Sequence, residues 1–236
     1  MDFKKDFPIF KNNNEKYPLI YFDNASTTQK PQCVINSISH FYSHYNANVH
    51  RGNYKIAEKA TLEFENSRQT IANFINSNKD EILFTRGTTE SINLIAYSFA
   101  NLIKDGDEII ISEMEHHSNI LPWQMIKEKK NIKIRYISVN ENGQLDLDKF
   151  ESLINKKTKL CSIISMSNIL GTINDLSKIS ELTQKYDIPL LIDAAQSIAH
   201  EKIDVKKINC DFLVFSGHKI MGPTGVGVIY MRRKFL

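Results

Sequence analysis

A lysine and a histidine stand side by side in FSGHKIMGPTGVG, residues 215–227, directly after an apolar run. A lysine at the buried end of a strand loses hydration, which lowers the pKa of its amine and makes the amine nucleophilic. The alternative is a surface lysine whose stem lies along the protein and whose ammonium stays in water. His218 and the surrounding glycines, which let the backbone turn tightly and approach a ligand, favour a reactive amine at Lys219.

Two other segments carry groups that complement an amine. Asp193 follows the apolar run PLLI, where a carboxylate is costly to bury unless it caps a helix or pairs with a cation such as a protonated ring nitrogen. Gly87, Thr88 and Thr89 open a predicted helix. The free N–H groups and hydroxyls at such a helix start suit a phosphate, although a threonine that only caps the helix is the commoner arrangement.

The adjacent pair His116 and His117 raises the question of a metal site. Neighbouring side chains rarely bind one ion together, and no further His or Cys stands nearby at a metal-site spacing, so we expect no metal. An imidazole that stacks on an aromatic ligand or transfers protons fits the pair better. A purely structural, hydrogen-bonded histidine is the alternative for either residue.

These residues follow short apolar runs that alternate with helical patterns. One helix is indicated by Ile92, Ile95, Ala96 and Phe99, and another by the stripe from Leu176 to Tyr186, with Asn174 or Asp175 as its cap. Apolar strands that alternate with helices predict a mostly parallel sheet covered on both faces, with the ligand crevice at the carboxyl ends of the strands. The expected strands are EILFT (81–85), EIIIS (108–112), IKIRYISV (132–139), KLCSIISMS (159–167), IPLLIDA (188–194) and CDFLVFS (210–216).

The strand ends together point to one cofactor. Pyridoxal phosphate needs an amine for a Schiff base, an acid opposite its pyridine nitrogen and an anion site for its phosphate, and it benefits from a ring over its face. We predict that Lys219, Asp193, Thr88 or Thr89, and His117 supply these four groups.

Several motifs, taken in order, resemble the class V aminotransferases and look most like the SUF-type (group II) cysteine desulfurases. The resemblance runs from about Tyr21 to the last residue and implies the large domain of the fold type I transferases that use pyridoxal phosphate. The motifs are YFDNASTTQKP, NVHRGNY, FTRGTTESINL, SEMEHHSNILPWQ, SNILGT, LIDAAQS and DFLVFSGHKIMGPTGVG.

The resemblance assigns a role to each matching residue. Lys219 would hold the cofactor and act as acid and base on the substrate, Asp193 would pair with the pyridine nitrogen, and His117 would stack on the ring. Gln196 would hydrogen-bond the ring hydroxyl, and Asn168 would bind the substrate carboxylate. The phosphate would be bound by Thr88, Thr89, Ser216 and His218, and the entrance of the site would be lined by Ala25, His50 and Arg51.

The implied reaction converts L-cysteine to L-alanine and leaves a persulfide on an enzyme cysteine for iron–sulfur cluster assembly. L-selenocysteine is a second expected substrate. By resemblance we also expect a homodimer and a SufE- or SufU-like sulfur acceptor. Another class V enzyme, such as a selenocysteine lyase, an aminotransferase or a kynureninase-like hydrolase, and a remnant without catalysis are the alternatives.

The family continues beyond the last residue of this sequence, into a smaller domain with the catalytic cysteine and a carboxylate-binding arginine. We therefore expect an N-terminal arm over residues 1–20 with a loop at 11–16, an incomplete large domain over 21–236, and no turnover by these residues alone. Cys33, Cys161 and Cys210 are interpreted as small apolar residues. The final strand, GVGVIYM, is expected to form an exposed, aggregation-prone edge.

Composition fits a protein of the cytoplasm. The net charge is only +3 and basic residues are not interleaved with aromatics, so we expect no nucleic-acid partner. Three distant cysteines form no disulfide framework and suggest a reducing compartment. No targeting segment is visible, and the most apolar window, residues 92–103, is too short to cross a bilayer.

Overall fold

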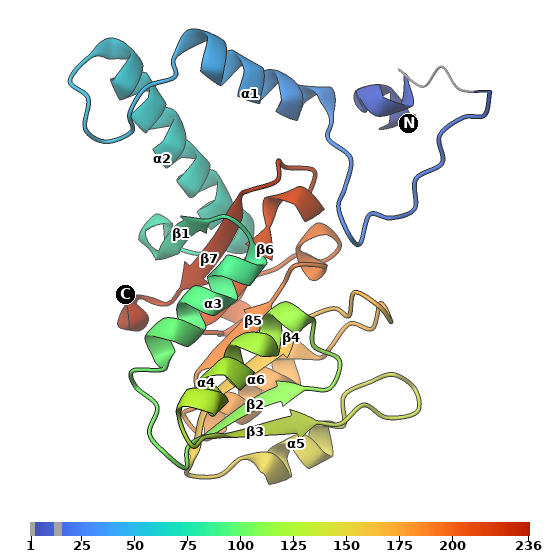
Figure 1. The fold of residues 1–236 in the computed structure, drawn as a ribbon, viewed down its shortest axis with the longest axis vertical. Coiled ribbons are helices and arrows are strands. Elements are labelled where there is room, and N and C mark those ends of the chain that lie inside the picture. Colours follow the sequence, from blue (N-terminus) through green and yellow to red (C-terminus); the bar gives the residue numbers. More distant parts are fainter. Residues whose placement is uncertain (1–2, 12–15) are drawn as a thin grey trace.

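The computed structural model of the chain describes residues 3–11 and 16–236. A seven-stranded sheet runs through it in the order β1-β7-β6-β5-β4-β2-β3 (Figure 1). Each strand that the sequence predicted is present within a few residues of its expected bounds. The strands are β1 (Ile82–Thr85), β2 (Glu108–Ser112), β3 (Lys133–Ile137), β4 (Thr158–Ile164), β5 (Leu190–Asp193), β6 (Phe212–Ser216) and β7 (Gly227–Met231).

The sheet is mostly parallel, as predicted. β3, β2, β4, β5 and β6 pair in parallel, and β7 is antiparallel to both β6 and β1. The expectation that the last strand forms an exposed edge is wrong, because β7 lies between β1 and β6 and pairs with both. A single antiparallel strand inserted there leaves β1 and β6 running the same way, so their carboxyl ends meet at one rim of the sheet.

Helices cover both faces of the sheet because its strands are apolar on both sides. Ile109 and Ile111 of β2 pack in a core with α3 and α4, whereas Ile110 between them packs in a second core with α2, α5, α6 and α7. The helices are α1 (Gln32–His44), α2 (Lys55–Ile75), α3 (Thr88–Phe99), α4 (Leu121–Lys129), α5 (Leu147–Leu153), α6 (Leu176–Lys185) and α7 (Val205–Ile208). Asp175 caps α6 by accepting the N–H of Lys178.

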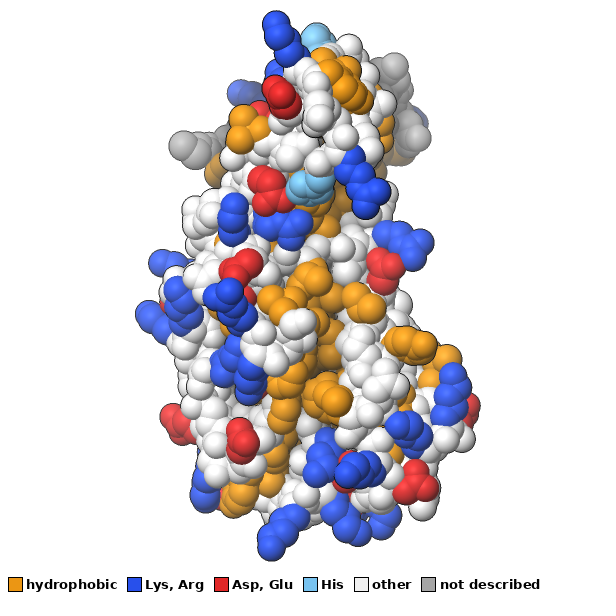
Figure 2. Space-filling view, turned by 90° about the vertical axis from the view of Figure 1, so that its left-hand side faces the viewer, with side chains coloured by type: hydrophobic (Ala, Val, Ile, Leu, Met, Phe, Trp, Pro, Cys, Tyr) orange, Lys and Arg blue, Asp and Glu red, His pale blue; other side chains and the backbone are white. Residues whose placement is uncertain are grey.

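The N-terminal part and α1 extend beyond the sheet (Figure 1). Short 3-10 turns span Phe3–Asp6 and Pro8–Phe10, whereas the loop predicted at 11–16 falls mostly outside the described residues. α1 buries none of its residues and exposes Ile35, Ile38 and Tyr42. Figure 2 shows the side of the molecule that lies on the left in Figure 1. A band of hydrophobic side chains runs along this face, with Lys and Arg along much of its flanks. Apolar surface of this extent is typical of a surface that another polypeptide segment covers.

In the described part of the chain, no helix is long and apolar enough to cross a membrane.

Gly227 at the start of β7 lies against the turn that precedes α3. A Cβ at this position would lie 2.4 Å from both the Cα and the N of Gly87, and 2.6 Å from Thr85 Oγ1. Two of these three atoms belong to the backbone, so a side chain at residue 227 would push the turn away from the strand.

We therefore expect Gly227→Ala to lower the free energy of unfolding by about 2 kcal/mol through overpacking, measured by urea denaturation. Gly217→Ala is the matched control, because its Cβ would meet its nearest atoms at 3.4 Å, an ordinary contact distance. Equal losses in the two variants would contradict the assignment of Gly227 as the close-approach point.

Candidate active site

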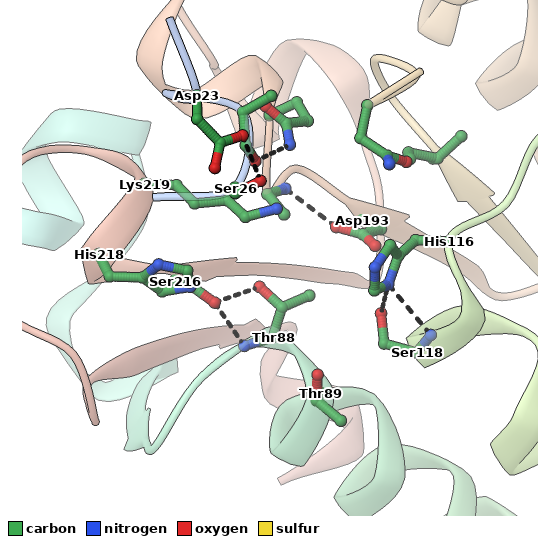
Figure 3. A pocket seen from close by; sticks show the side chains of 15 residues that line it. Asp23, Ser26, Thr88, Thr89, His116, Ser118, Asp193, Ser216, His218 and Lys219 are labelled. Atoms are coloured by element: carbon green, nitrogen blue, oxygen red, sulfur yellow. Dashed lines mark hydrogen bonds between the residues drawn. The ribbon is translucent and has the colours of Figure 1, made fainter. Parts of the chain in front are cut away.

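A cavity of about 480 Å³ opens at the carboxyl ends of the parallel strands (Figure 3). It gathers residues from the ends of β4, β5 and β6, from the start of α3 and from the segment before α1. This is the rim that the sequence predicted for a ligand. Its lining residues are Asp23, Ala25, Ser26, Thr88, Thr89, His116, Ser118, Ile164, Asn168, Asp193, Ala195, Gln196, Ser216, His218 and Lys219.

A buried carboxylate and an amine dominate the electrostatics of this cavity. Asp193, 1% exposed, accepts one hydrogen bond from the N–H of Ala195 at 2.9 Å. Burial raises the pKa of Asp193 to about 6, while the Ala195 N–H and the charge of Lys219 act in the opposite direction. Burial also lowers the pKa of Lys219, and the charge of Asp193 opposes that shift. The site can therefore accept a cationic group beside Asp193 and offers an amine with enhanced nucleophilic character.

The loop that carries Lys219 is held by the segment before α1. The carbonyl oxygen of His218 accepts the N–H of Thr28 at 2.9 Å, the hydroxyl of Thr28 at 2.9 Å and the ammonium of Lys30 at 3.2 Å. The Thr28 hydroxyl also accepts the N–H of Met221 at 2.8 Å. Our sequence reasoning gave no role to these residues, although they stand in the motif YFDNASTTQKP; only their contacts across some 190 residues reveal the role.

The start of α3 and the end of β6 form the polar wall opposite Asp193. Thr88 donates its N–H to Ser216 Oγ at 2.8 Å, and the two hydroxyls lie 2.8 Å apart. Thr89 and His218 line the same side of the cavity. Gly87, the N-cap of α3, has no side chain to cap the helix, and Thr88 and Thr89 line the cavity, so the positive end of the helix faces it. The four residues predicted to bind phosphate are thus together.

The two histidines differ in position. His116 lines the cavity, whereas His117 is absent from the lining residues and begins the 3-10 turn His117–Asn119. Burial lowers the pKa of His116, and the charges of Lys219 and His117 add to the effect. The Nδ1 atom of His116 lies 2.8 Å from Ser118 Oγ, which fixes the ring (Figure 3). The sequence analysis predicted His117 for the ring over the ligand, whereas His116 is the member of the pair that lines the cavity.

The remaining predicted residues divide into two groups. Asn168, Ala25 and Gln196 line the cavity, and Gln196 donates its side-chain amide to the carbonyl of Ala25 at 2.7 Å. His50 and Arg51 do not line it. They lie in the loop before α2, where the N–H of His50 donates to Thr61 Oγ1 at 2.9 Å. Among the described residues no cluster of three or more His, Cys, Asp or Glu side chains could hold a metal ion.

None of the three cysteines is among the residues that line this cavity. Cys161 in β4 and Cys210 before β6 are buried, as expected of small apolar residues, and burial raises the pKa of Cys210 to about 12. Cys33 lies on α1 and is exposed.

The raised pKa of Asp193 predicts a pH dependence of stability. Between the unfolded value of 3.8 and about 6, the folded chain binds more protons at this carboxyl than the unfolded chain does, so its contribution to the free energy of unfolding falls as pH rises. Relative to Asp193→Asn, the wild-type chain should lose about 1 kcal/mol between pH 5 and pH 7 in urea titrations without ligand. Asp105→Asn, at an exposed carboxylate, should show no such difference. A wild-type chain that gains stability relative to Asp193→Asn would contradict the burial argument.

Comparison with known proteins extends this description. The sequence model for aminotransferase class-V matches residues 20–236. A probable cysteine desulfurase of Borreliella burgdorferi is 49% identical over 231 residues, which cover 97% of this chain and 55% of the relative. The chain thus spans a little over half of that curated relative.

Solved structures agree with the sequence relatives. The apo structure of a cysteine desulfurase from Thermococcus onnurineus NA1 superposes with a TM-score of 0.93 at 40% identity, covering 99% of this chain and 57% of that one. The protein SspA, solved in complex with cysteine, gives a TM-score of 0.84 at 31% identity, with coverages of 91% and 62%.

The family match therefore covers the whole sheet and every residue of the cavity, and the chain belongs to the class V aminotransferases.

Proposed function

We propose that this chain is the cofactor-binding part of a SUF-type cysteine desulfurase that uses pyridoxal phosphate. The reaction would convert L-cysteine to L-alanine and pass the sulfur, as a persulfide, toward iron–sulfur cluster assembly. The observation that carries the proposal is that Lys219, Asp193 and the start of α3 meet in one cavity at the carboxyl ends of the sheet. The names of the relatives support the choice of cysteine as substrate.

The residues of the cavity fit pyridoxal phosphate group by group. A buried carboxylate with a raised pKa matches a protonated pyridine nitrogen, because pairing with a cation offsets the cost of burial. The helix start at Thr88, with Thr89, Ser216 and His218 beside it, matches a phosphate. Lys219 supplies an amine in the same cavity, so the three groups that the cofactor requires are present together.

Residues of this chain would hold the cofactor, bind the substrate and transfer its α-proton. When bound, pyridoxal phosphate supplies an electron sink for the negative charge left at the substrate α-carbon. Lys219 would hold the cofactor through its Nζ atom and then move the α-proton, since its lowered pKa makes the neutral amine available. Asn168 would bind the substrate carboxylate, and Gln196 would turn from Ala25 toward the ring hydroxyl.

The ring over the cofactor face is assigned to His116 rather than to His117. Only His116 of the pair lines the cavity, and its pKa is lowered by burial, which favours the neutral imidazole that stacks on a ring. His117, the residue expected from the sequence, would support the turn from outside. His50 and Arg51, expected at the entrance, would reach a site only through a partner or a further part of the protein.

Partners of the whole protein belong to the same proposal. The exposed apolar side chains of α1 and α2, such as Ile35, Ile38 and Leu62, suit a homodimer interface. A SufE- or SufU-like protein would accept the sulfur, and L-selenocysteine would be a second substrate. Three unpaired cysteines are consistent with a cytoplasmic location. The buried thiols of Cys161 and Cys210 have raised pKa values, which makes them poor sulfur acceptors.

Covalent trapping tests the proposal. We expect pyridoxal phosphate to give the purified chain a visible absorption band, which borohydride removes, and peptide mass mapping to locate the reduced adduct on Lys219. Lys219→Ala should lose the band, whereas Lys206→Ala, at an exposed lysine of α7, should keep it. An adduct on Lys30, the nearby lysine whose pKa is also lowered by burial, would contradict the assignment. A folded chain that forms no adduct would exclude the cofactor role.

A further inference from the structure

A buried acid that the proposed chemistry does not use lies directly behind the cavity. Glu115 is 7% exposed and precedes His116 in the chain. Its carboxylate accepts hydrogen bonds from Ser112 Oγ at 2.5 Å, from the N–H of Ile164 at 2.8 Å and from Asn119 Nδ2 at 2.7 Å. β2, β4 and the turn 117–119 each supply one donor, so the carboxylate joins three elements at one point.

Asn119 links Glu115 to helix α4 through its side-chain amide. Its Oδ1 atom accepts the indole N–H of Trp123 at 3.1 Å and the hydroxyl of Ser162 at 2.6 Å. Asn119 and Trp123 are both fully buried. The spacing of Glu115, Asn119 and Trp123, four residues apart each time, brings the three side chains into one line.

The same turn fixes the histidine that faces the cavity. The N–H of Asn119 donates to the carbonyl of His116 at 2.7 Å, and the N–H of Ser118 donates to His116 Nδ1 at 3.2 Å. On the other side, Ile164, which binds Glu115 through its N–H, pairs with Asp193 across β4 and β5. Glu115 therefore connects β4, which pairs with the strand that carries Asp193, with the turn that carries His116.

The side chain at position 115 must accept a hydrogen bond from Ile164 and another from Asn119. The N–H groups of Ile164 and Trp123 are donors alone, and the amide of Asn119 between them donates at one end and accepts at the other. A carboxylate meets both Ile164 and Asn119 as an acceptor. A glutamine in its place would present its NH₂ group to one of two donors whichever way its amide turned, so one bond would break.

We propose that Glu115 is a positioning residue, which holds the turn 116–119 against β2 and β4 and so sets His116 over the cavity. The inference rests on the proposed function only where it links the turn to cofactor binding. The geometry of the turn itself is independent of any ligand.

The ionisation of Glu115 gives this network a measurable signature. Burial raises the pKa of Glu115 to about 8, opposed by its hydrogen bonds from Ser112, Ile164 and Asn119 and reinforced by the charge of Asp193. The titratable groups around it are Asp193 on β5, Cys161 on β4 and His116 in the turn. Ser112 can accept a hydrogen bond as well as donate one, so it can take the proton of the neutral acid while the other bonds persist.

Trp123 reports on the network because it is the single tryptophan of the chain. In the chain without cofactor we expect the tryptophan emission to change with pH, with a midpoint near pH 8. Glu115→Gln should abolish that transition and weaken the binding of pyridoxal phosphate about tenfold, as expected when a buried donor is left without an acceptor. Glu113→Gln is the matched control: this exposed carboxylate, two residues earlier, accepts the N–H of Val139 and should leave both measurements unchanged.

The pH titration of tryptophan emission needs no cofactor, so it tests the role of Glu115 even if the chain does not bind pyridoxal phosphate. A transition that persists in Glu115→Gln would contradict the proposal, as would unchanged cofactor affinity in a chain that does bind pyridoxal phosphate. A Glu115→Gln chain without native far-UV circular dichroism would also contradict it, because the proposal assigns to Glu115 the local turn and not the fold.

Discussion

The burial of the Asp193 carboxylate at the end of β5 is the constraint from which the rest of the site follows. A charge enclosed by apolar strands needs a cation or donors, and within the described structure Asp193 receives one backbone N–H bond and the field of Lys219. Both groups come from ends of adjacent parallel strands, since β5 pairs directly with β6. Burial raises the pKa of Asp193 to about 6, and the N–H of Ala195 and the charge of Lys219 oppose this shift only in part, so the carboxylate can still bind a further cation.

Backbone contacts then determine the shape of the cavity around this pair. The close approach of Gly227 to Gly87 brings the start of α3 against β7, beside the end of β6. The hydrogen bonds of Thr28 and Lys30 to the carbonyl of His218 hold the lysine loop from the other side. Neither contact involves a group that is proposed to react. Both limit where the amine and the anion site can lie, which is what a cofactor with a fixed distance between its ring and its phosphate requires.

Sequence reasoning recovered the parts of this arrangement that follow from local patterns. Apolar runs with polar ends predicted the strands, and parallel pairing predicted that Lys219, Asp193 and Thr88 would meet. The prediction of an exposed final strand was wrong, because contacts between segments distant in the sequence determine the strand order. The place of β7 between β1 and β6 depends on which strand it pairs with, and apolar alternation carries no such information. Which of His116 and His117 lines the cavity, and where the loop with His50 and Arg51 lies, are likewise features that the local pattern does not contain.

The most direct test of the central claim concerns the protonation of the ligand that Asp193 is proposed to bind. Pyridoxal phosphate labelled with ¹⁵N at the ring can be bound to the chain and observed by NMR at pH 8. We expect a protonated ring nitrogen in the wild-type chain and an unprotonated one in Asp193→Asn, because a carboxylate stabilises the cation in a buried site and a neutral amide does not. The same unprotonated nitrogen in both chains would contradict it.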